Sequence, residues 1–393
     1  MAGVSAAVAA ARQGADVLLV EQYADLGGTA TTCGVGAFCG ETTGQGEVFD
    51  DIVRALERLD AIQAYKPYTE REFRKFDHER LKFILADLAL SAGVRLVLHT
   101  RIADAECDDG RLQSVVLDTV DGLKRIEPRM AIDCTGDGAL AHAAGLPCMK
   151  GGPDGGPQLP PSLMFFIRDL GRPVTPRLPA GLTPIESDDD LPMLSFWDEG
   201  DGQIGCKLKV IGFDTTDPAQ FTDLEVTARR EMMRVLHYIQ RTSHPTYELS
   251  YVSAQVGLRE GRRVTGEYVL AEADLRAGRR FDDAIALGCF YLDAHDPTHR
   301  KNVYLPQDRH VPPYQIPFRS LRASGTANLL AAGRCLSAEQ IALASCRVMT
   351  TASMTGQAAG IAAALCLGDA IDLPDLPIPR LQSTLTAHAA RLE

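Results

Sequence analysis

One short segment of this chain carries side chains suited to moving a proton. Tyr291, Asp293, His295 and Asp296 place a single imidazole among carboxylates. Imidazole titrates near neutral pH, and a neighbouring carboxylate can orient the ring for proton transfer. We therefore interpret His295 as a candidate catalytic acid or base, and a purely structural histidine is the alternative.

Arginines supply the candidate anion sites. Arg347 has the fixed charge and planar donors that suit a substrate carboxylate, and a buried ion pair with Glu339 is the alternative. The basic cluster at 259–263 stands out in an acidic chain and invites an anionic ligand, while internal pairing with Glu260 and Glu267 is its alternative.

Composition limits the classes of protein that fit this chain. It has 393 residues, 45% hydrophobic and 23% charged, which is ordinary for a two-domain globular enzyme. The formal net charge of −12 argues against a nucleic-acid partner, which needs a concentrated basic face. The ten cysteines lack the spacing of a zinc or iron–sulfur site, and no apolar run is long enough for a membrane span. We expect a cytoplasmic protein without metal or membrane that acts on a small molecule.

The candidate residues need a scaffold, and the N-terminal stretch predicts one. A small-residue helix closed by Gly14 leads into the apolar strand 16–21, as in the second half of a dinucleotide-binding βαβ unit. Gly3 matches the third glycine of G-x-G-x-x-G, and Glu21 matches the acid that binds ribose hydroxyls. The first two glycines and their strand would precede Met1, so we expect a misassigned start or a cut chain; a natively short protein is the alternative.

Three further glycine turns repeat this strand–turn–helix pattern. They are Gly27-Gly28-Thr29, Thr135-Gly136-Asp137 after the strand 130–134, and Gly333-Arg334 after the strand at 328. The last leads to an Ala- and Gly-rich helix at 352–367 that contains Gly356 and Gln357. Such turns let backbone approach a ligand closely, and helix N-termini stabilise negative charge.

The segments between these blocks have ordinary periodic patterns. The predicted helices cover 48–64, 77–92 and 223–241, and the predicted strands cover 94–100, 102–118, 120–129, 162–167 and 203–211. Cys33 and Cys39 are interpreted as buried inert thiols, with a redox pair as the alternative.

Taken together, the glycine blocks, the segment 259–268 and the block 328–360 resemble FAD-dependent oxidoreductases related to the flavin subunit of heterodisulfide reductase. The resemblance implies an α/β fold. A Rossmann-like FAD-binding domain with a three-layer, mostly parallel sheet would occupy 1–150 and 311–393, and an inserted α+β substrate or cap domain would occupy 151–310.

The resemblance also implies roles for individual residues. Glu21 would bind the adenosine ribose, Thr135 to Asp137 would close over the adenine and pyrophosphate, and Arg334 would approach the ribityl chain. The implied FAD-binding residues are Gly3, Glu21, Gly27, Gly28, Thr29, Thr135, Gly136, Asp137, Gly333, Arg334, Gly356 and Gln357. His295 and Arg347 would be catalytic, with Arg347 on a substrate carboxylate or on the N1 charge of reduced flavin.

Several functions remain open at this level. We expect an oxidoreductase that moves a hydride or electrons between FAD and a small, anionic molecule. The iron–sulfur cysteines of the heterodisulfide-reductase relatives are absent, so an external electron donor or acceptor protein, or direct hydride exchange with the substrate, would complete the reaction. The alternatives are a non-catalytic binding or assembly subunit and an electron-transfer subunit of a larger complex; a nicotinamide dehydrogenase is disfavoured. The oligomeric state is open.

Overall fold

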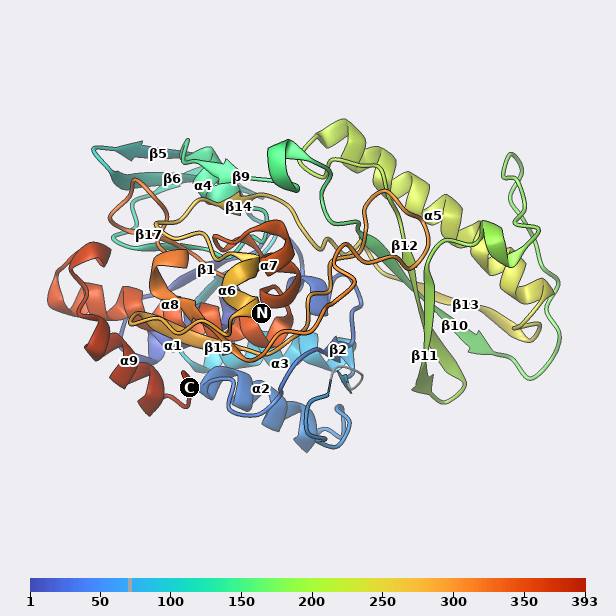
Figure 1. The fold of residues 1–393 in the computed structure, drawn as a ribbon, viewed down its shortest axis with the longest axis horizontal. Coiled ribbons are helices and arrows are strands. Elements are labelled where there is room, and N and C mark those ends of the chain that lie inside the picture. The colour runs from blue at the N-terminus through green and yellow to red at the C-terminus, as the bar shows by residue number, and fades with distance from the viewer. Residues whose placement is uncertain (70–72) are drawn as a thin grey trace.

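The first helix, α1 (Ala2–Arg12), lies at the centre of the larger of two bodies in the computed structural model, which describes residues 1–69 and 73–393 (Figure 1). It packs along α8 (Met349–Asp369), the small-residue helix near the other end of the chain. A Cβ atom on Gly356 or Gly360 would lie 2.2 Å from the carbonyl oxygen of Ala2 or Ala6, respectively. Only glycine at these two positions lets the helix backbones touch.

Two pairs of parallel strands accompany α1. β1 (Leu18–Val20) pairs with β4 (Arg95–Val97), and β8 (Ala131–Asp133) pairs with β17 (Leu329–Ala331). Two helices complete the N-terminal part, α2 (Glu47–Arg58) and α3 (His78–Ser91), whose apolar faces enter the same core as α1 and α8. This is the parallel α/β arrangement that the sequence predicts.

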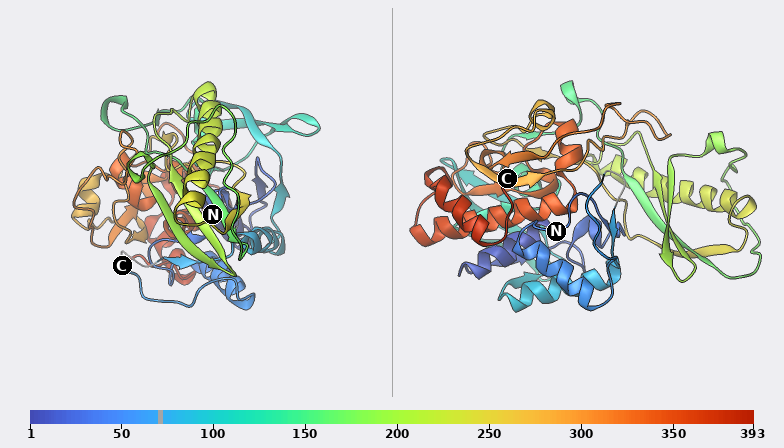
Figure 2. Two further views of the ribbon diagram at one scale, coloured as in Figure 1. Left: turned by 90° about the vertical axis from the view of Figure 1, so that its right-hand side faces the viewer. Right: turned by 60° about the horizontal axis from the view of Figure 1, so that its bottom comes forward.

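The smaller body is an antiparallel sheet with one long helix on one face (Figures 1 and 2). The strand order is β11 (Leu194–Gly200), β12 (Gln203–Lys209), β10 (Ser162–Asp169) and β13 (Tyr247–Val252), and the helix is α5 (Pro218–Arg241). Because side chains alternate along a strand, Phe165 and Leu208 join the core under α5, while Met164, Phe166 and Lys207 lie on the opposite face.

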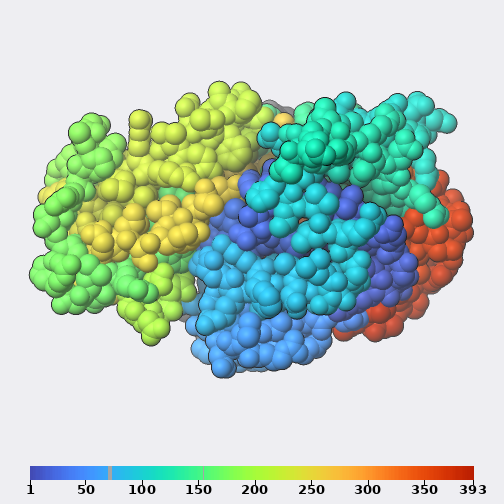
Figure 3. All heavy atoms as spheres, turned by 180° about the vertical axis from the view of Figure 1, so that it is seen from behind, coloured from blue at the N-terminus to red at the C-terminus, as the bar shows by residue number. Residues whose placement is uncertain are grey.

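That opposite face of the sheet is turned toward the larger body. The ring of His78, at the start of α3, stacks on Phe166 at 5.2 Å between centroids. A Cβ on Gly34 would lie 3.3 Å from the same phenyl ring. Seen from behind, the smaller body rests against the N-terminal third of the chain (Figure 3). The face is therefore positioned to form one wall of a site between the two bodies.

A segment at 291–311 returns from the larger body to the smaller one, and we call it the strap. In Figure 1 it is the orange loop that passes beside β12. The backbone N–H of Met193 donates to the carbonyl of Arg300 at 2.7 Å, and the Lys209 ammonium donates to the carbonyl of Lys301 at 2.6 Å. Arg300 also pairs with Glu231 of α5 at 2.9 Å. These bonds hold Asp293 and His295 between the two bodies.

The remaining elements are short. A three-stranded antiparallel sheet, β5 (Arg101–Asp108), β6 (Arg111–Thr119) and β7 (Gly122–Ile126), confirms the predicted hairpin and its extension. The other pairs are β2 (Ala37–Phe38) with β3 (Arg74–Lys75), β9 (Cys148–Met149) with β14 (Arg263–Val264), and β15 (Ala284–Gly288) with β16 (Tyr314–Pro317). The short helices are α4 (Ala139–Ala143), α6 (Glu272–Arg276), α7 (Gln340–Cys346) and α9 (Ile378–Ala387).

Two predicted helix limits were wrong. The helix predicted over 48–64 ends at Arg58, because Asp60 takes a left-handed φ of 50° and Ile62 then bridges to Phe76. The helix predicted from 223 starts at Pro218, because the Asp217 carboxylate caps it by accepting the N–H of Gln220 at 2.9 Å. Among the residues described, no helix is long and apolar enough to cross a membrane.

Candidate functional site

The Asp293 carboxylate joins two of the residues that the sequence singles out. Its Oδ2 accepts a hydrogen bond from Nη2 of Arg347 at 2.9 Å, and its Oδ1 lies 3.3 Å from Nε2 of His295. Arg347 also donates to the backbone carbonyl of Asp293 at 3.1 Å. The strap brings Asp293 and His295, and the turn between α7 and α8 brings Arg347. The structure therefore places His295 and Arg347 in one site.

The alternative partner considered for Arg347 was wrong. The Glu339 carboxylate accepts the N–H of Glu272 at 2.9 Å, where α6 begins. Negative charge is favourable at that position because helix N-termini carry unsatisfied N–H groups. Glu339 thus serves the helix, and Asp293 compensates the charge of Arg347.

Burial and charge fix the protonation states of this group. Burial raises the pKa of Asp293, but the hydrogen bond from His295 and the charges of Arg347 and Arg259 outweigh it and hold the pKa below its ordinary value. Burial, together with the Arg259 charge, lowers the pKa of His295 to about 4. At neutral pH the pair is therefore a carboxylate and a neutral imidazole.

The neutral imidazole has one ring nitrogen free for chemistry. Because Nε2 faces the Asp293 carboxylate, we assign the ring proton to Nε2, which leaves a lone pair on Nδ1. Nδ1 is buried and has no hydrogen-bond partner within the described chain. The ring is held against Tyr304 at 4.6 Å between centroids. An unpartnered, oriented lone pair is what a general base requires.

Further cations surround Asp293. Arg259 is buried and donates from Nη1 to the carbonyl of Pro160 at 2.6 Å and to Oγ of Ser162 at 2.7 Å. Lys207, which the sequence reasoning missed, lies on the inward face of β12, and both cations are close enough to Asp293 and Arg347 to feel their charges. The sequence does contain a hint of its role. Lys207 stands in the predicted strand between Cys206 and Leu208, both of which are buried, so its side chain points to the other face of the sheet. The site carries more positive than negative charge.

Arg263, in the same basic cluster, has a structural role. Arg263 forms a buried ion pair with Glu260, and the Glu260 carboxylate also accepts the N–H groups of Gly151 at 2.7 Å and Leu159 at 2.8 Å. The interpretation of this segment as an internal network therefore holds for Arg263, whereas Arg259 faces the group around Asp293.

A second cluster contains most of the residues predicted to bind the cofactor. Arg334 Nη1 and Asp137 Oδ1 lie 3.2 Å apart as an ion pair, yet both atoms are buried and neither makes a hydrogen bond within the residues that the structure covers. The Arg334 guanidinium lies over Gly136. Asp137 and Glu21 both influence the pKa of Tyr23, so the two carboxylates share one neighbourhood. Buried polar atoms without partners are the mark of a site built for a polar ligand.

Backbone conformation supports the same cluster. Gly27 and Gly28 have φ of 110° and 59°, which L side chains rarely adopt. Thr29 follows in the same turn. The turn therefore brings bare backbone beside Glu21, as a nucleotide-binding loop requires.

Other predicted cofactor residues have structural partners. Thr135 Oγ1 donates to the Asp133 carboxylate at 2.7 Å. Gly3 lies against Cys134, because a Cβ added to Gly3 would be 3.3 Å from the Cβ of Cys134. Gly333 lies against Ala2. Gln357 accepts the N–H of Val48 at 3.0 Å and donates to the His388 carbonyl at 2.9 Å, which ties α8 to α2 and to the end of α9. Contacts of these residues and of Gly356 with the cofactor stay a prediction.

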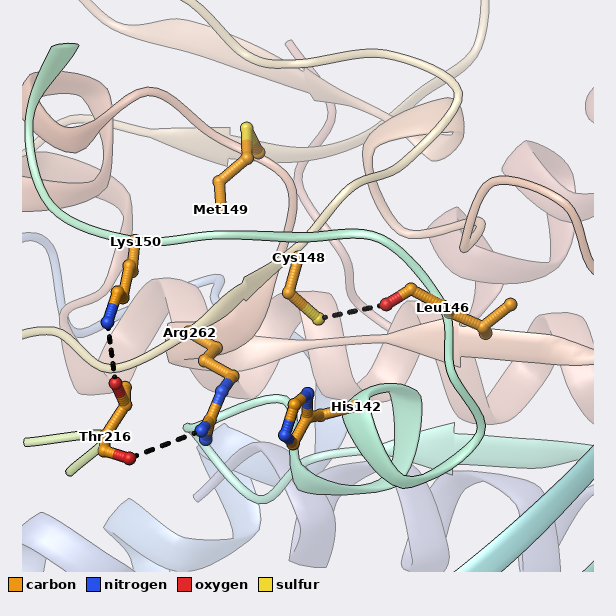
Figure 4. Close-up of a pocket in the computed structure, with 7 residues that line it drawn as sticks. All are labelled: His142, Leu146, Cys148, Met149, Lys150, Thr216 and Arg262. Atoms are coloured by element: carbon orange, nitrogen blue, oxygen red, sulfur yellow. Dashed lines mark hydrogen bonds between the residues drawn. The ribbon is translucent and has the colours of Figure 1, made fainter. Parts of the chain in front are cut away.

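A surface pocket of about 330 Å³ lies next to the turn that carries Asp137, because Arg262, which lines it, packs against Gly138 (Figure 4). Its lining residues are His142, Leu146, Cys148, Met149, Lys150, Thr216 and Arg262. Lys150 is neutralised by Asp214 at 2.6 Å. Arg262 of the basic cluster 259–263 lines this pocket, whereas none of the residues predicted to be catalytic or to bind the cofactor does.

A metal ion or a redox pair would need clustered histidines, cysteines or acids. No group of them has the arrangement of a metal site in the residues searched. Burial raises the pKa of Cys33 to about 11 and of Cys39 to about 12, which keeps both as unreactive thiols.

The fold and these clusters agree with a comparison against protein-family models. Residues 1–385 match the model described as FAD dependent oxidoreductase, and the chain belongs to that family. It is an oxidoreductase enzyme whose cofactor is FAD. The Asp137 and Arg334 atoms that lack hydrogen bonds and the open backbone at Gly28, where an added Cβ would have nothing within 4 Å, fit this cofactor.

Solved structures show the same fold. The OxyS anhydrotetracycline hydroxylase from Streptomyces rimosus aligns with a TM-score of 0.51 at 11% identity, covering 99% of this chain and 64% of that one. BexE, studied for oxidation during BE-7585A biosynthesis, aligns with a TM-score of 0.50 at 12% identity and with the same coverage of 99% and 64%. The chain thus spans less than two thirds of the length of these structures. A search of curated proteins found no match. The expected fold, a Rossmann-like FAD-binding domain with a second domain, is confirmed.

Proposed function

We propose that this enzyme transfers a hydride or electrons between FAD and a small anionic molecule at the group formed by Asp293, His295 and Arg347. The observation that carries the proposal is the Asp293 carboxylate, which holds Arg347 and His295 together at 2.9 and 3.3 Å. FAD supplies the redox chemistry when bound. The protein's own contribution is to move a proton and to hold negative charge.

In this proposal His295 is the acid or base. Its Nδ1 takes a proton from the substrate or returns one, while Asp293 keeps the ring oriented and stabilises its charged form. A low pKa of the histidine keeps Nδ1 unprotonated at neutral pH, ready to accept. Solvent is excluded because the ring is buried.

Arg347 holds an anion in this proposal. Its Nη2 is occupied by Asp293, but its Nε is buried and without a hydrogen-bond partner in the described chain. A substrate carboxylate would satisfy this donor, and the alternative is the N1 charge of the reduced flavin. Both uses need the guanidinium to stay where Asp293 keeps it.

The cofactor residues predicted from the sequence are part of the proposal. Glu21, with one carboxylate oxygen accepting the N–H of Tyr23 at 3.1 Å, has its other oxygen for ribose hydroxyls. Arg334 and Asp137 would face the polar part of FAD. We also propose that the FAD-binding domain comprises 1–150 and 311–393 and that the substrate or cap domain comprises 151–310. Within this last range, residues of α6 and β15 pack in the core of the larger body.

The relation to the flavin subunit of heterodisulfide reductase and an external electron partner are proposed as well. They rest on the resemblance of the glycine blocks. A small-molecule substrate is the simpler reading of a site with one histidine and several cations.

The test is anaerobic reduction of the FAD-loaded protein by a panel of organic acids, followed by flavin absorbance. With an acid that bleaches the flavin, we expect His295→Gln to slow reduction on the order of 10²–10⁴-fold. His299→Gln is the matched control, because His299 lies on the same strap but is exposed. A His295→Gln protein that is reduced at the wild-type rate would overturn the role of His295, and flavin that no acid or electron donor reduces would favour the non-catalytic alternative.

A further inference from the structure

Lys207 occupies an unusual position on the sheet of the smaller body. Along β12, Cys206 and Leu208 face α5, so Lys207 faces the larger body. It lies opposite Met164 of β10 and Ser195 of β11. Lys209, two residues further on the same face, donates to the carbonyls of Asp296 and Lys301, so this face lies beside the strap that carries Asp293.

The ammonium of Lys207 lacks a partner. Within residues 1–69 and 73–393 it makes no hydrogen bond and has no carboxylate within 4.0 Å. Lys209, two residues along on the same face, is different, because it donates to the carbonyls of Lys301 at 2.6 Å and Asp296 at 3.3 Å. A half-buried charge without a partner is costly, and a ligand anion would remove that cost.

The surroundings of Lys207 are apolar on one side. Met164 is buried beside it, and the half-buried ring of Trp197 covers Gly205 on the same face of the sheet, where an added Cβ would lie 2.5 Å from the indole. Met164 is covered by Gly34 of the larger body, so a ligand that reaches the ammonium across this face meets the indole of Trp197, whose N–H donates to Glu199. Planar apolar groups pack well on an indole.

We propose that Lys207 binds the carboxylate of the substrate and that the apolar, planar part of the substrate lies over the half-buried indole of Trp197. This inference rests on the proposed function and deepens it, because it names an aromatic or similarly planar carboxylate as the substrate class. Arg347 then lies on the Asp293 side of the same anion.

Benzoate is the probe, measured by isothermal titration calorimetry with the FAD-loaded enzyme, and flavin absorbance reports whether it binds near the cofactor. Benzamide is the neutral analogue, and chloride and phosphate are the inorganic anions. The variants are Lys207→Met, Lys207→Arg to retain the charge, and Lys124→Met as a matched exposed control. Thermal melting and FAD content verify that each variant is folded.

We expect benzoate to bind the wild type and to perturb the flavin, with affinity weakened about tenfold or more in Lys207→Met. Lys207→Arg and Lys124→Met should bind benzoate nearly as the wild type does, and benzamide should bind weakly to all. Four outcomes would each overturn the inference. Benzoate could bind Lys207→Met as tightly as the wild type, or not bind the wild type at all. Benzamide could bind as tightly as benzoate, or chloride or phosphate could do so.

Failure of the Lys207 test and failure of the proposed function give different results. Benzoate binding by His295→Gln needs no proton transfer, so a failure of His295 in the kinetic test leaves the Lys207 result readable. Conversely, flavin reduction could be lost in His295→Gln while benzoate affinity is unchanged in Lys207→Met. That result would support the catalytic role of His295 and reject only the carboxylate site at Lys207.

Discussion

Arg347 and Asp293 are 54 residues apart in the chain, and their side chains meet at 2.9 Å between Nη2 and Oδ2. The contact joins the turn before α8 to the strap. It is one of the contacts by which a segment fastened to the smaller body is also held to the larger one.

Removing the charge of Asp293 should be costly. Asp293→Asn leaves Arg347 and Arg259 without their shared carboxylate, and we expect a loss of about 3 kcal/mol in the free energy of unfolding. Urea denaturation measures it, and the double variant with Arg347→Met should lose less than the sum of the single variants. Asp16→Asn is the control, since its pair with Arg95 is exposed and should matter by less than about 1 kcal/mol. Additive losses in the double variant would contradict the coupling.

Acid should destabilise the protein partly through His295. Burial holds its folded pKa at about 4, below the ordinary value near 6.5. Between those two values the unfolded chain binds a proton that the folded chain does not, so stability falls as pH drops from about 6.5 to about 4. Urea denaturation across this range should show a shallower pH dependence in His295→Gln. An unchanged slope would mean that His295 titrates normally when folded.

Carboxylate binding should weaken in alkali. Burial lowers the pKa of Lys207 to about 8, with Arg259 and Arg347 lowering it further and Asp293 and Cys39 opposing them. As pH rises through about 8 the ammonium loses its proton, and we expect benzoate affinity to fall over that range. In Lys207→Arg the decline should disappear below pH 10, because a guanidinium stays charged. A decline that persists in this variant would point to another group.

The contact between α1 and α8 should tolerate no side chain. Gly360→Ala would set a methyl group 2.2 Å from the carbonyl oxygen of Ala6, and separating the helices should cost about 3 kcal/mol. Gly368 lies in the same helix with nothing within 4 Å of an added Cβ, so Gly368→Ala should leave stability unchanged or slightly higher. Thermal melting compares the two; similar melting temperatures would show that the helices adjust freely.

FAD retention should depend on Arg334. Arg334→Met removes the buried guanidinium that faces Asp137 and leaves that carboxylate unpaired, so we expect FAD affinity to fall by about tenfold or more. Fluorescence titration of the apoprotein with FAD measures this, and Arg95→Met is the exposed control. Wild-type affinity in Arg334→Met would remove Arg334 from the cofactor site.

Sequence patterns predicted what local spacing encodes. The alternation and periodicity of the strands and helices, and the pairing of Asp293 with His295, depend on residues close in the chain. The small residues of α8 pack against α1, which is more than 300 residues away in sequence, whereas the family resemblance assigned Gly356 to the cofactor.

Contacts between distant segments were the part that sequence could not supply. Glu339 was chosen as the alternative partner of Arg347 because it is near in sequence, whereas the true partner arrives on the strap. Lys207 was overlooked because its significance depends on which sheet face meets the larger body. The register of β12 and the position of the smaller body decide which face of the sheet meets the larger body, and local sequence patterns predict neither.

The strap has a mechanical consequence. Lys209 and Arg300 tie it to the smaller body, while Arg347 belongs to the larger one. Leu292 and Val311 of the strap lie in the core of the larger body, and Ala294, next to His295, packs with Ala344 of α7. A movement of the two bodies relative to each other would therefore bend the strap between Ala294 and Arg300 and leave Asp293, His295 and Arg347 together.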